Sequence, residues 1–181
     1  GGINFSRVSF TPAIKQDLLV SNTFGLVFRH VSERNIGLQV EVNALNKGWK
    51  EVIDSIGTYS RRLSTVEVPL MAAFILGEKT VRFSFTIGTY VSYLYDEKEK
   101  TVFNDVVRYR PYYFKPLLTK WEFGFIGGLG VEFHTSIGAF AIRASYRHGL
   151  NNIYSLKEPD YYYSASRGQV IHAGIMYFYT F

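Results

Sequence analysis

The amino-acid sequence predicts an all-β fold, an eight-stranded antiparallel up-and-down β-barrel that crosses a membrane. Three observations lead to this prediction. Apolar residues recur with a period of two, short and long connections alternate along the chain, and no apolar run approaches the roughly 18 residues that a transmembrane helix needs. The longest such run, Pro69 to Leu76, is far shorter. We expect residues 1–181 to form a single barrel domain.

The alternation of apolar and polar residues marks the expected strands, which are residues 2–10, 21–30, 36–46, 63–76, 80–94, 120–133, 137–150 and 169–181. Most of them reach the roughly 9–11 residues that a tilted strand needs to cross a bilayer. Three connections are short and fall near residues 31–35, 77–79 and 134–136. The others are long and span residues 11–20, 47–62, 95–119 and 151–168. This order is typical of a meander whose short turns face the periplasm, which would place both termini there.

The two faces of the expected strands differ in chemistry. In segment 80–94 the odd positions are mostly large and apolar, whereas the even positions mix Arg82 with small residues. A soluble lipocalin-like barrel turns its apolar face inward, but a membrane barrel turns that face toward lipid. The membrane arrangement is favoured by aromatic residues at strand ends, where interfacial girdles lie: Tyr93, Tyr95, Trp121, Phe133, Tyr177 and Tyr179.

Equal numbers of acids and arginines fall on the expected lumen face: Glu41, Glu67, Glu122, Glu132, Arg29, Arg82, Arg143 and Arg147. Eight strands enclose only enough room for side chains, so these charges must pair. We expect a closed network with Arg82–Glu132 and Glu122–Arg147 as pairs between adjacent strands. A polar relay or a narrow ion path along the same residues is the functional alternative.

The long loops are the best place for a binding function. They carry the candidate contact residues Arg108, Tyr109, Arg110, Tyr112, Tyr113, Tyr161, Tyr162 and Tyr163. Tyrosine and arginine are enriched where proteins meet. An upper aromatic girdle explains the same residues equally well, with the cations of segment 108–120 facing lipid phosphates.

Catalysis and cofactor chemistry find little support in the sequence. Cysteine is absent, and strand parity puts His148 and His172 on opposite faces, so we expect no metal site, no cofactor and no enzymatic activity. Ser145 has no evident acid and base to complete a triad. The net charge of +5 is spread along the chain, without the basic run that nucleic-acid binding needs. No signal peptide is visible at Gly1, so we expect a mature or trimmed form.

The C-terminal segment places Tyr177, Tyr179 and Phe181 on one face, which resembles the β-signal that the assembly machinery of bacterial outer membranes recognises. Further stretches resemble the PorT-type outer-membrane β-barrel family of Bacteroidetes-like bacteria. They are residues 3–6, 25–28, 39–41, 66–70, 123–133 and 143–153. The resemblance spans nearly the whole chain in order, but its motifs are structural, and the loops, above all 95–119, depart from it.

The resemblance implies location in the outer membrane of a Gram-negative bacterium, among lipopolysaccharide and phospholipid, with other outer-membrane or periplasmic proteins as partners. It also implies an accessory role in an outer-membrane assembly, connected with type nine protein secretion. Two alternatives remain open at this point. One is a free-standing barrel of the OmpA or OmpX sort, which would serve envelope integrity or adhesion. The other is a soluble lipocalin-like binder.

Overall fold

A closed antiparallel barrel is the architecture of the computed structural model, which describes residues 1–11, 13–32, 35–53, 57–77, 80–103, 117–154 and 165–179. Its strands are β1 (Gly2–Thr11), β2 (Gln16–Asp17), β3 (Leu19–Val31), β4 (Ile36–Ile53), β5 (Gly57–Leu76), β6 (Val81–Phe103), β7 (Trp121–Thr135), β8 (Gly138–Gly149) and β9 (Ala165–Phe178). Within the described residues, no helix has the length and apolar character needed to cross a membrane.

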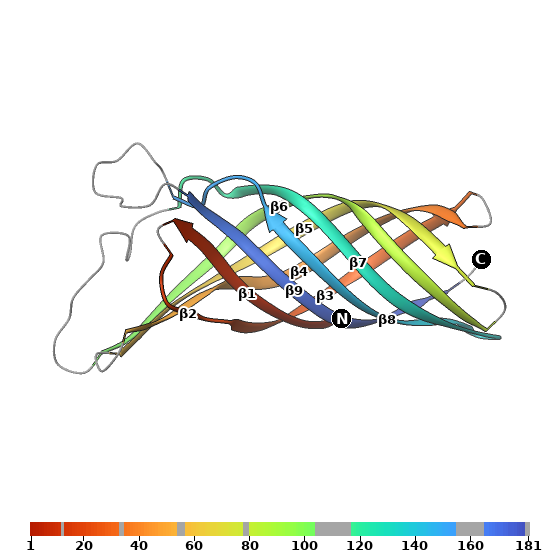
Figure 1. Ribbon diagram of the computed structural model, residues 1–181, viewed down its shortest axis with the longest axis horizontal. Helices are drawn as coiled ribbons and strands as arrows, with labels where there is room; N and C mark the ends of the chain where they lie inside the picture. Colours follow the sequence, from red (N-terminus) through yellow and green to blue (C-terminus); the bar gives the residue numbers. More distant parts are fainter. Residues whose placement is uncertain are drawn as a thin grey trace.

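The eight long strands pair in chain order, and β1 also pairs with β9, so the sheet closes on itself (Figure 1). The two-residue β2 adds to the edge of β4 at one end. This confirms the predicted eight-stranded all-β meander barrel. Closure matters physically because a membrane leaves no water to satisfy the backbone groups of a free strand edge.

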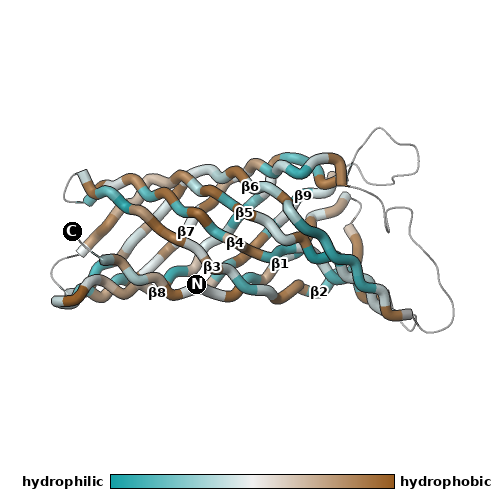
Figure 2. The backbone as a smooth tube through the Cα atoms, turned by 180° about the vertical axis from the view of Figure 1, so that it is seen from behind, coloured by the Kyte–Doolittle hydropathy of each residue, from teal (hydrophilic) through white to brown (hydrophobic). Residues whose placement is uncertain are grey.

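The outer surface of the barrel is apolar. Phe83, Phe125 and Ile142 come from three neighbouring strands and are 59%, 56% and 61% exposed. Side chains of this kind would be buried in a water-soluble barrel, so the lipocalin-like alternative is wrong. Figure 2 shows the hydrophilic stretches gathered where the strands reach past the barrel, and apolar residues alternating with polar ones along the rest.

Three strands extend furthest beyond their expected bounds, and β9 also begins earlier than expected, at Ala165. Residues 47–62 and 95–119 were expected to be connections, but β4 continues to Ile53, β5 begins at Gly57 and β6 continues to Phe103. The prediction failed for two reasons. Asn46, Lys47 and Gly48 are residue types that are common in turns, and in the extended part of β6 both faces carry charged residues, so apolar and polar residues do not alternate there. We call this extension of β4, β5 and β6 the projecting sheet; it reaches past the loop end of the barrel (Figure 1).

Glycines on the inner face make room for large polar side chains. A Cβ atom on Gly124 would lie 2.3 Å from the carbonyl oxygen of His148 and 2.6 Å from the ring of Tyr90. On Gly168 it would lie 3.2 Å from a carboxylate oxygen of Glu122. The glycines of β7 and β9 therefore set the width available to the lumen residues.

Replacing Gly124 should therefore destabilise the barrel, whereas its neighbour on the outer face should tolerate a methyl group. A Cβ on Gly127 would meet its nearest atom at 3.8 Å. We expect Gly124→Ala to lower the free energy of unfolding by about 1–3 kcal/mol, as overpacking does, and Gly127→Ala to change it by less than about 1 kcal/mol. Urea unfolding in phospholipid vesicles measures both. Equal effects of the two variants would contradict the tight fit at Gly124.

Candidate functional site

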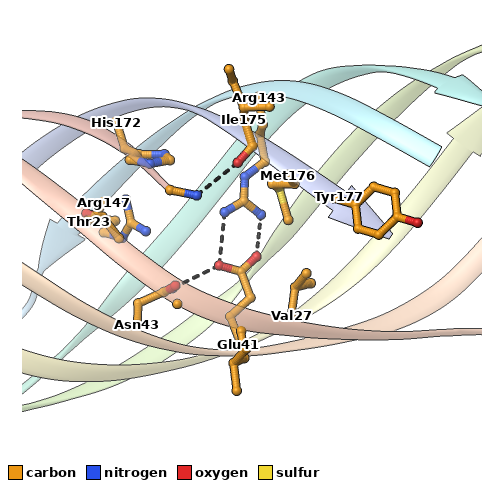
Figure 3. A pocket seen from close by; sticks show the side chains of 13 residues that line it. Thr23, Val27, Glu41, Asn43, Arg143, Arg147, His172, Ile175, Met176 and Tyr177 are labelled. Atoms are coloured by element: carbon orange, nitrogen blue, oxygen red, sulfur yellow. Dashed lines mark hydrogen bonds and ion pairs between the residues drawn. The ribbon is translucent and has the colours of Figure 1, made fainter. Parts of the chain in front are cut away.

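Opposite walls of the barrel are joined by a bidentate ion pair. Glu41 on β4 accepts from both terminal nitrogens of Arg143 on β8, and the second contact is 2.9 Å long. Asn43 donates to the same carboxylate over 2.9 Å, and Gln39 donates to its other oxygen. Figure 3 shows Arg143 and Glu41 meeting across the pocket, with Asn43 beside them. Both ionic side chains are buried, and the two carboxylate oxygens of Glu41 meet the two terminal nitrogens of Arg143.

A second and a third pair extend this network along the barrel. Arg147 on β8 donates from its Nε to Glu67 on β5 over 2.7 Å. Toward the turn end, Arg29 on β3 donates to Glu132 on β7 over 2.6 Å. Arg29 also donates to the Oε1 of Gln39 over 2.7 Å, which links this pair to the one at Glu41.

The fourth pair lies toward the loop end. Lys47 on β4 contacts Glu122 on β7 at 2.6 Å, and the hydroxyl of Tyr90 donates to the same carboxylate over 2.7 Å. The sequence analysis missed Lys47 because that residue was assigned to a loop. Gln39, Glu41 and Asn43 are odd-numbered residues of the same strand and face inward. The odd number of Lys47 therefore indicated that its side chain faces inward too.

Both predicted partnerships between adjacent strands are wrong. Arg82 stands directly opposite Glu132 in the strand register, yet Glu132 pairs with Arg29 from the far wall. Glu122 pairs with Lys47 rather than with Arg147. The physical reason is the narrow lumen, in which an arginine or lysine side chain is long enough to reach across and meet a carboxylate head-on.

An aromatic cluster closes the lumen at the loop end. We call it the aromatic plug: Phe10, Trp49, Tyr59 and Tyr154, packed with Val8, Leu63, Leu94 and Ile153. The rings of Phe10 and Trp49 are 5.7 Å apart, and those of Trp49 and Tyr154 are 6.0 Å apart, both edge to face. Edge-to-face packing of this kind stabilises a cluster beyond its buried area.

Arg61 stands opposite Trp49 of the plug in the projecting sheet and is fully buried. It contacts Glu97 at 2.9 Å and Glu99 at 3.1 Å, and it donates to the hydroxyl of Tyr154 over 3.0 Å. Tyr59 donates to Glu99 over 2.7 Å. Burial raises the pKa of the Tyr59 hydroxyl far above its usual value, so the hydroxyl keeps its proton and remains a donor. Sequence parity with Leu63, Thr65 and Glu67 could have identified Arg61 as inward-facing.

A cavity of about 290 Å³ borders the Glu41–Arg143 pair and includes His172 in its lining. Ser145 lies opposite His172 in the register, but the Ser145 hydroxyl accepts a hydrogen bond from Arg147 over 3.3 Å. Neither imidazole nitrogen of His172 has a hydrogen-bond partner among the described residues. The cavity therefore holds no bonded pair of nucleophile and base. The described residues also contain no group of three or more side chains suited to hold a metal ion.

The proposed contact residues Arg108, Tyr109, Arg110, Tyr112, Tyr113, Tyr161, Tyr162 and Tyr163 lie outside the described residues. Of the C-terminal assembly signal, Tyr177 and Tyr179 are described and exposed on the outer face, at 47% and 66%. Phe181 lies outside the described part of the chain.

Residues 1–155 match the family model described as outer membrane protein beta-barrel domain. The chain belongs to this family. It is therefore a protein of the outer membrane, as the apolar outer face of the barrel requires. The family description covers such barrels in general and does not single out the PorT type.

Two solved structures are similar to the chain, although no curated protein matches it. One is Ail, the attachment invasion locus protein of Yersinia pestis, in complex with the heparin analogue sucrose octasulfate. It is 14% identical, with 97% of this chain and 93% of that chain covered and a TM-score of 0.46. The other is OprG from Pseudomonas aeruginosa, 11% identical, with 99% and 93% covered and a TM-score of 0.45.

The two arginines beside Glu132 offer a test of the network that crosses the lumen. Arg29→Gln removes the partner of a buried carboxylate, so we expect it to cost about 3–5 kcal/mol of unfolding free energy. Arg82→Gln should cost less than about 1 kcal/mol, because Glu132 keeps its bonded arginine. Urea unfolding in phospholipid vesicles compares them at one pH. A larger loss in the Arg82 variant would support the pairing between adjacent strands instead.

Proposed function

We propose that this outer-membrane barrel is non-enzymatic and acts as an accessory subunit that binds another protein through its projecting sheet. The observation that carries the proposal is a lumen crossed by ion pairs, with the aromatic plug over its loop end and one cavity of about 290 Å³ beside the Glu41–Arg143 pair. Such an interior leaves the outer surface and the loop end as the places for a binding function. The proposal places that action at the loop end, on the sheet formed by β4, β5 and β6.

The edge of β6 is the element best suited to such contact. Its pairing with β7 ends where Tyr93 lies opposite Trp121, whereas its pairing with β5 continues to Phe103. Among the described residues, positions 96–103 therefore pair on one side alone. A strand edge of this kind can accept an extended segment from a partner, with main-chain hydrogen bonds giving the affinity.

The closed lumen should be tested first, because an open pore would remove the reason for placing the function at the surface. We expect the refolded protein to give no discrete conductance steps in planar lipid bilayers, since the ion pairs and the plug block the lumen. Folding of the same sample is checked by its heat-dependent migration on gels. Reproducible single-channel steps would overturn the closed-barrel reading and favour the ion path.

Contact through the projecting sheet can be tested by cross-linking, because the chain has no cysteine of its own. We expect a photoreactive label on Val102→Cys, at a position 52% exposed on β6, to give one discrete adduct in native membranes. The matched control is Ser9→Cys, an exposed site near the loop end of β1. Similar adduct patterns from both sites, or none from Val102→Cys, would contradict the proposal.

A free-standing barrel for envelope integrity or adhesion is the competing function, and a lumen crossed by ion pairs suits it equally well. Co-purification in mild detergent separates the two, because only an accessory subunit retains a stoichiometric partner. The PorT-type resemblance adds type nine secretion as the assembly such a subunit would serve. The general family match does not support that narrower role, so the proposal stops at protein contact.

A further inference from the structure

The projecting sheet has two faces of opposite character. Its inner face carries acids and aromatic rings around Arg61. Its outer face carries four cations in two rows, which we call the basic face: Lys50, Arg62, Lys98 and Lys100. The strand register sets these rows, because Arg62 stands opposite Lys98, and Ser60 stands between Lys50 and Lys100. Neighbouring strands lie about 4.8 Å apart, so the four charges share one compact patch.

Local acids compensate only part of this charge. Asp17 and Asp96 each lie 3.8 Å from a lysine, Lys50 and Lys98 respectively, in exposed geometry. Arg62 and Lys100 have no carboxylate within 4.0 Å in the described part of the chain. The Lys98 side chain is 78% exposed. The patch therefore keeps a net positive charge that faces away from the protein.

The height of the basic face relative to the apolar band is the second observation. Toward the loop end of β5, Val66 is the last large apolar residue that faces outward. Ser64 and then Arg62 are the next two outward-facing positions. Four residues of a strand tilted by about 40° rise about 10 Å. The girdle residues Tyr93 and Trp121, with ring centroids 4.9 Å apart, mark the top of the band on β6 and β7.

Such a height corresponds to the headgroup layer, where lipid phosphates lie. Lysine and arginine side chains at this level can extend along the strand to reach them. At the opposite, turn end, the outer surface formed by the described residues carries no lysine or arginine. Among the described residues, the lysines and arginines of the outer surface therefore lie toward the loop end.

We propose that the basic face binds the phosphate groups of lipopolysaccharide. This lipid carries phosphate on its glucosamine headgroup, in the leaflet that faces the outside of the cell. The loop end of the barrel then lies on the outer side of the membrane, and the short turns lie on the periplasmic side. The inference is independent of the protein-contact role, because it concerns a face of the sheet and not its β6 edge.

Titration of fluorescent lipopolysaccharide into the detergent-solubilised protein tests this site. Each cation near an anionic lipid surface strengthens binding about fivefold at low salt, so Arg62→Gln/Lys98→Gln should bind roughly 20- to 30-fold more weakly. The difference should shrink as salt is raised. The charge-conserving variant Arg62→Lys/Lys98→Arg should bind like the wild type, which separates charge from folding.

The matched control removes two exposed arginines at the same end of the barrel but on other strands, Arg7→Gln/Arg167→Gln. We expect a loss of less than about threefold for this variant, because Arg7 and Arg167 lie on β1 and β9, outside the proposed site, where salt screens their attraction to a lipid bound at the basic face. A loss equal to that of the basic-face variant would show general charge attraction and overturn the site. Equal affinity of the wild type for phosphatidylglycerol vesicles would overturn the assignment to lipopolysaccharide.

Discussion

Burial of charge in a narrow lumen is the constraint on which the rest of the structure depends. An eight-stranded barrel in a membrane turns most of its apolar side chains to lipid, and below the aromatic plug this one lacks a continuous apolar core. Arginines and glutamates replace that core, and each buried charge must meet an opposite one or remain unstable. The Glu41–Arg143 and Arg147–Glu67 pairs meet this demand by joining walls that are distant in the sheet.

This packing explains which parts of the sequence follow strict rules. The outer face needs only apolar side chains that contact lipid. Phe83, Phe125 and Ile142 all meet this need although their side chains differ in shape. The inner face needs complementary volumes, so glycine at position 124 accompanies tyrosine at position 90 on the adjacent strand. The interior residues are engaged in contacts with one another, which is consistent with a function at the outer surface of the molecule.

The strand count, the closed meander and the orientation of the two faces could be predicted, because each depends on a period of two that the apolar residues show directly. The residues of the lumen network could be identified by the same parity. Their partners could not, since contact across a barrel depends on strand tilt and stagger, which no local pattern encodes. Arg82 and Glu132 illustrate this, being neighbours in register but not partners. The projecting sheet was missed because its alternation lies between Glu99 and Lys100, two charged residues, rather than between apolar and polar ones.

An irregularity in β6 has a consequence for the chemistry of the whole loop end. The register between β5 and β6 shifts between Ser64 and Thr65, so that Leu94 and Asp96 face consecutive residues of β5 while Tyr95 is left without a counterpart. A single inserted residue inverts the side of the sheet on which every later residue of β6 falls. If β6 instead kept strict alternation through Tyr95, Lys98 and Lys100 would point at Arg61 and the tyrosine rings, and Glu97 and Glu99 would lie on the outer face. The bulge thus sets the sign of the electrostatic potential on both faces of the projecting sheet, because the same β6 sequence paired without it would carry acids outside and lysines inside.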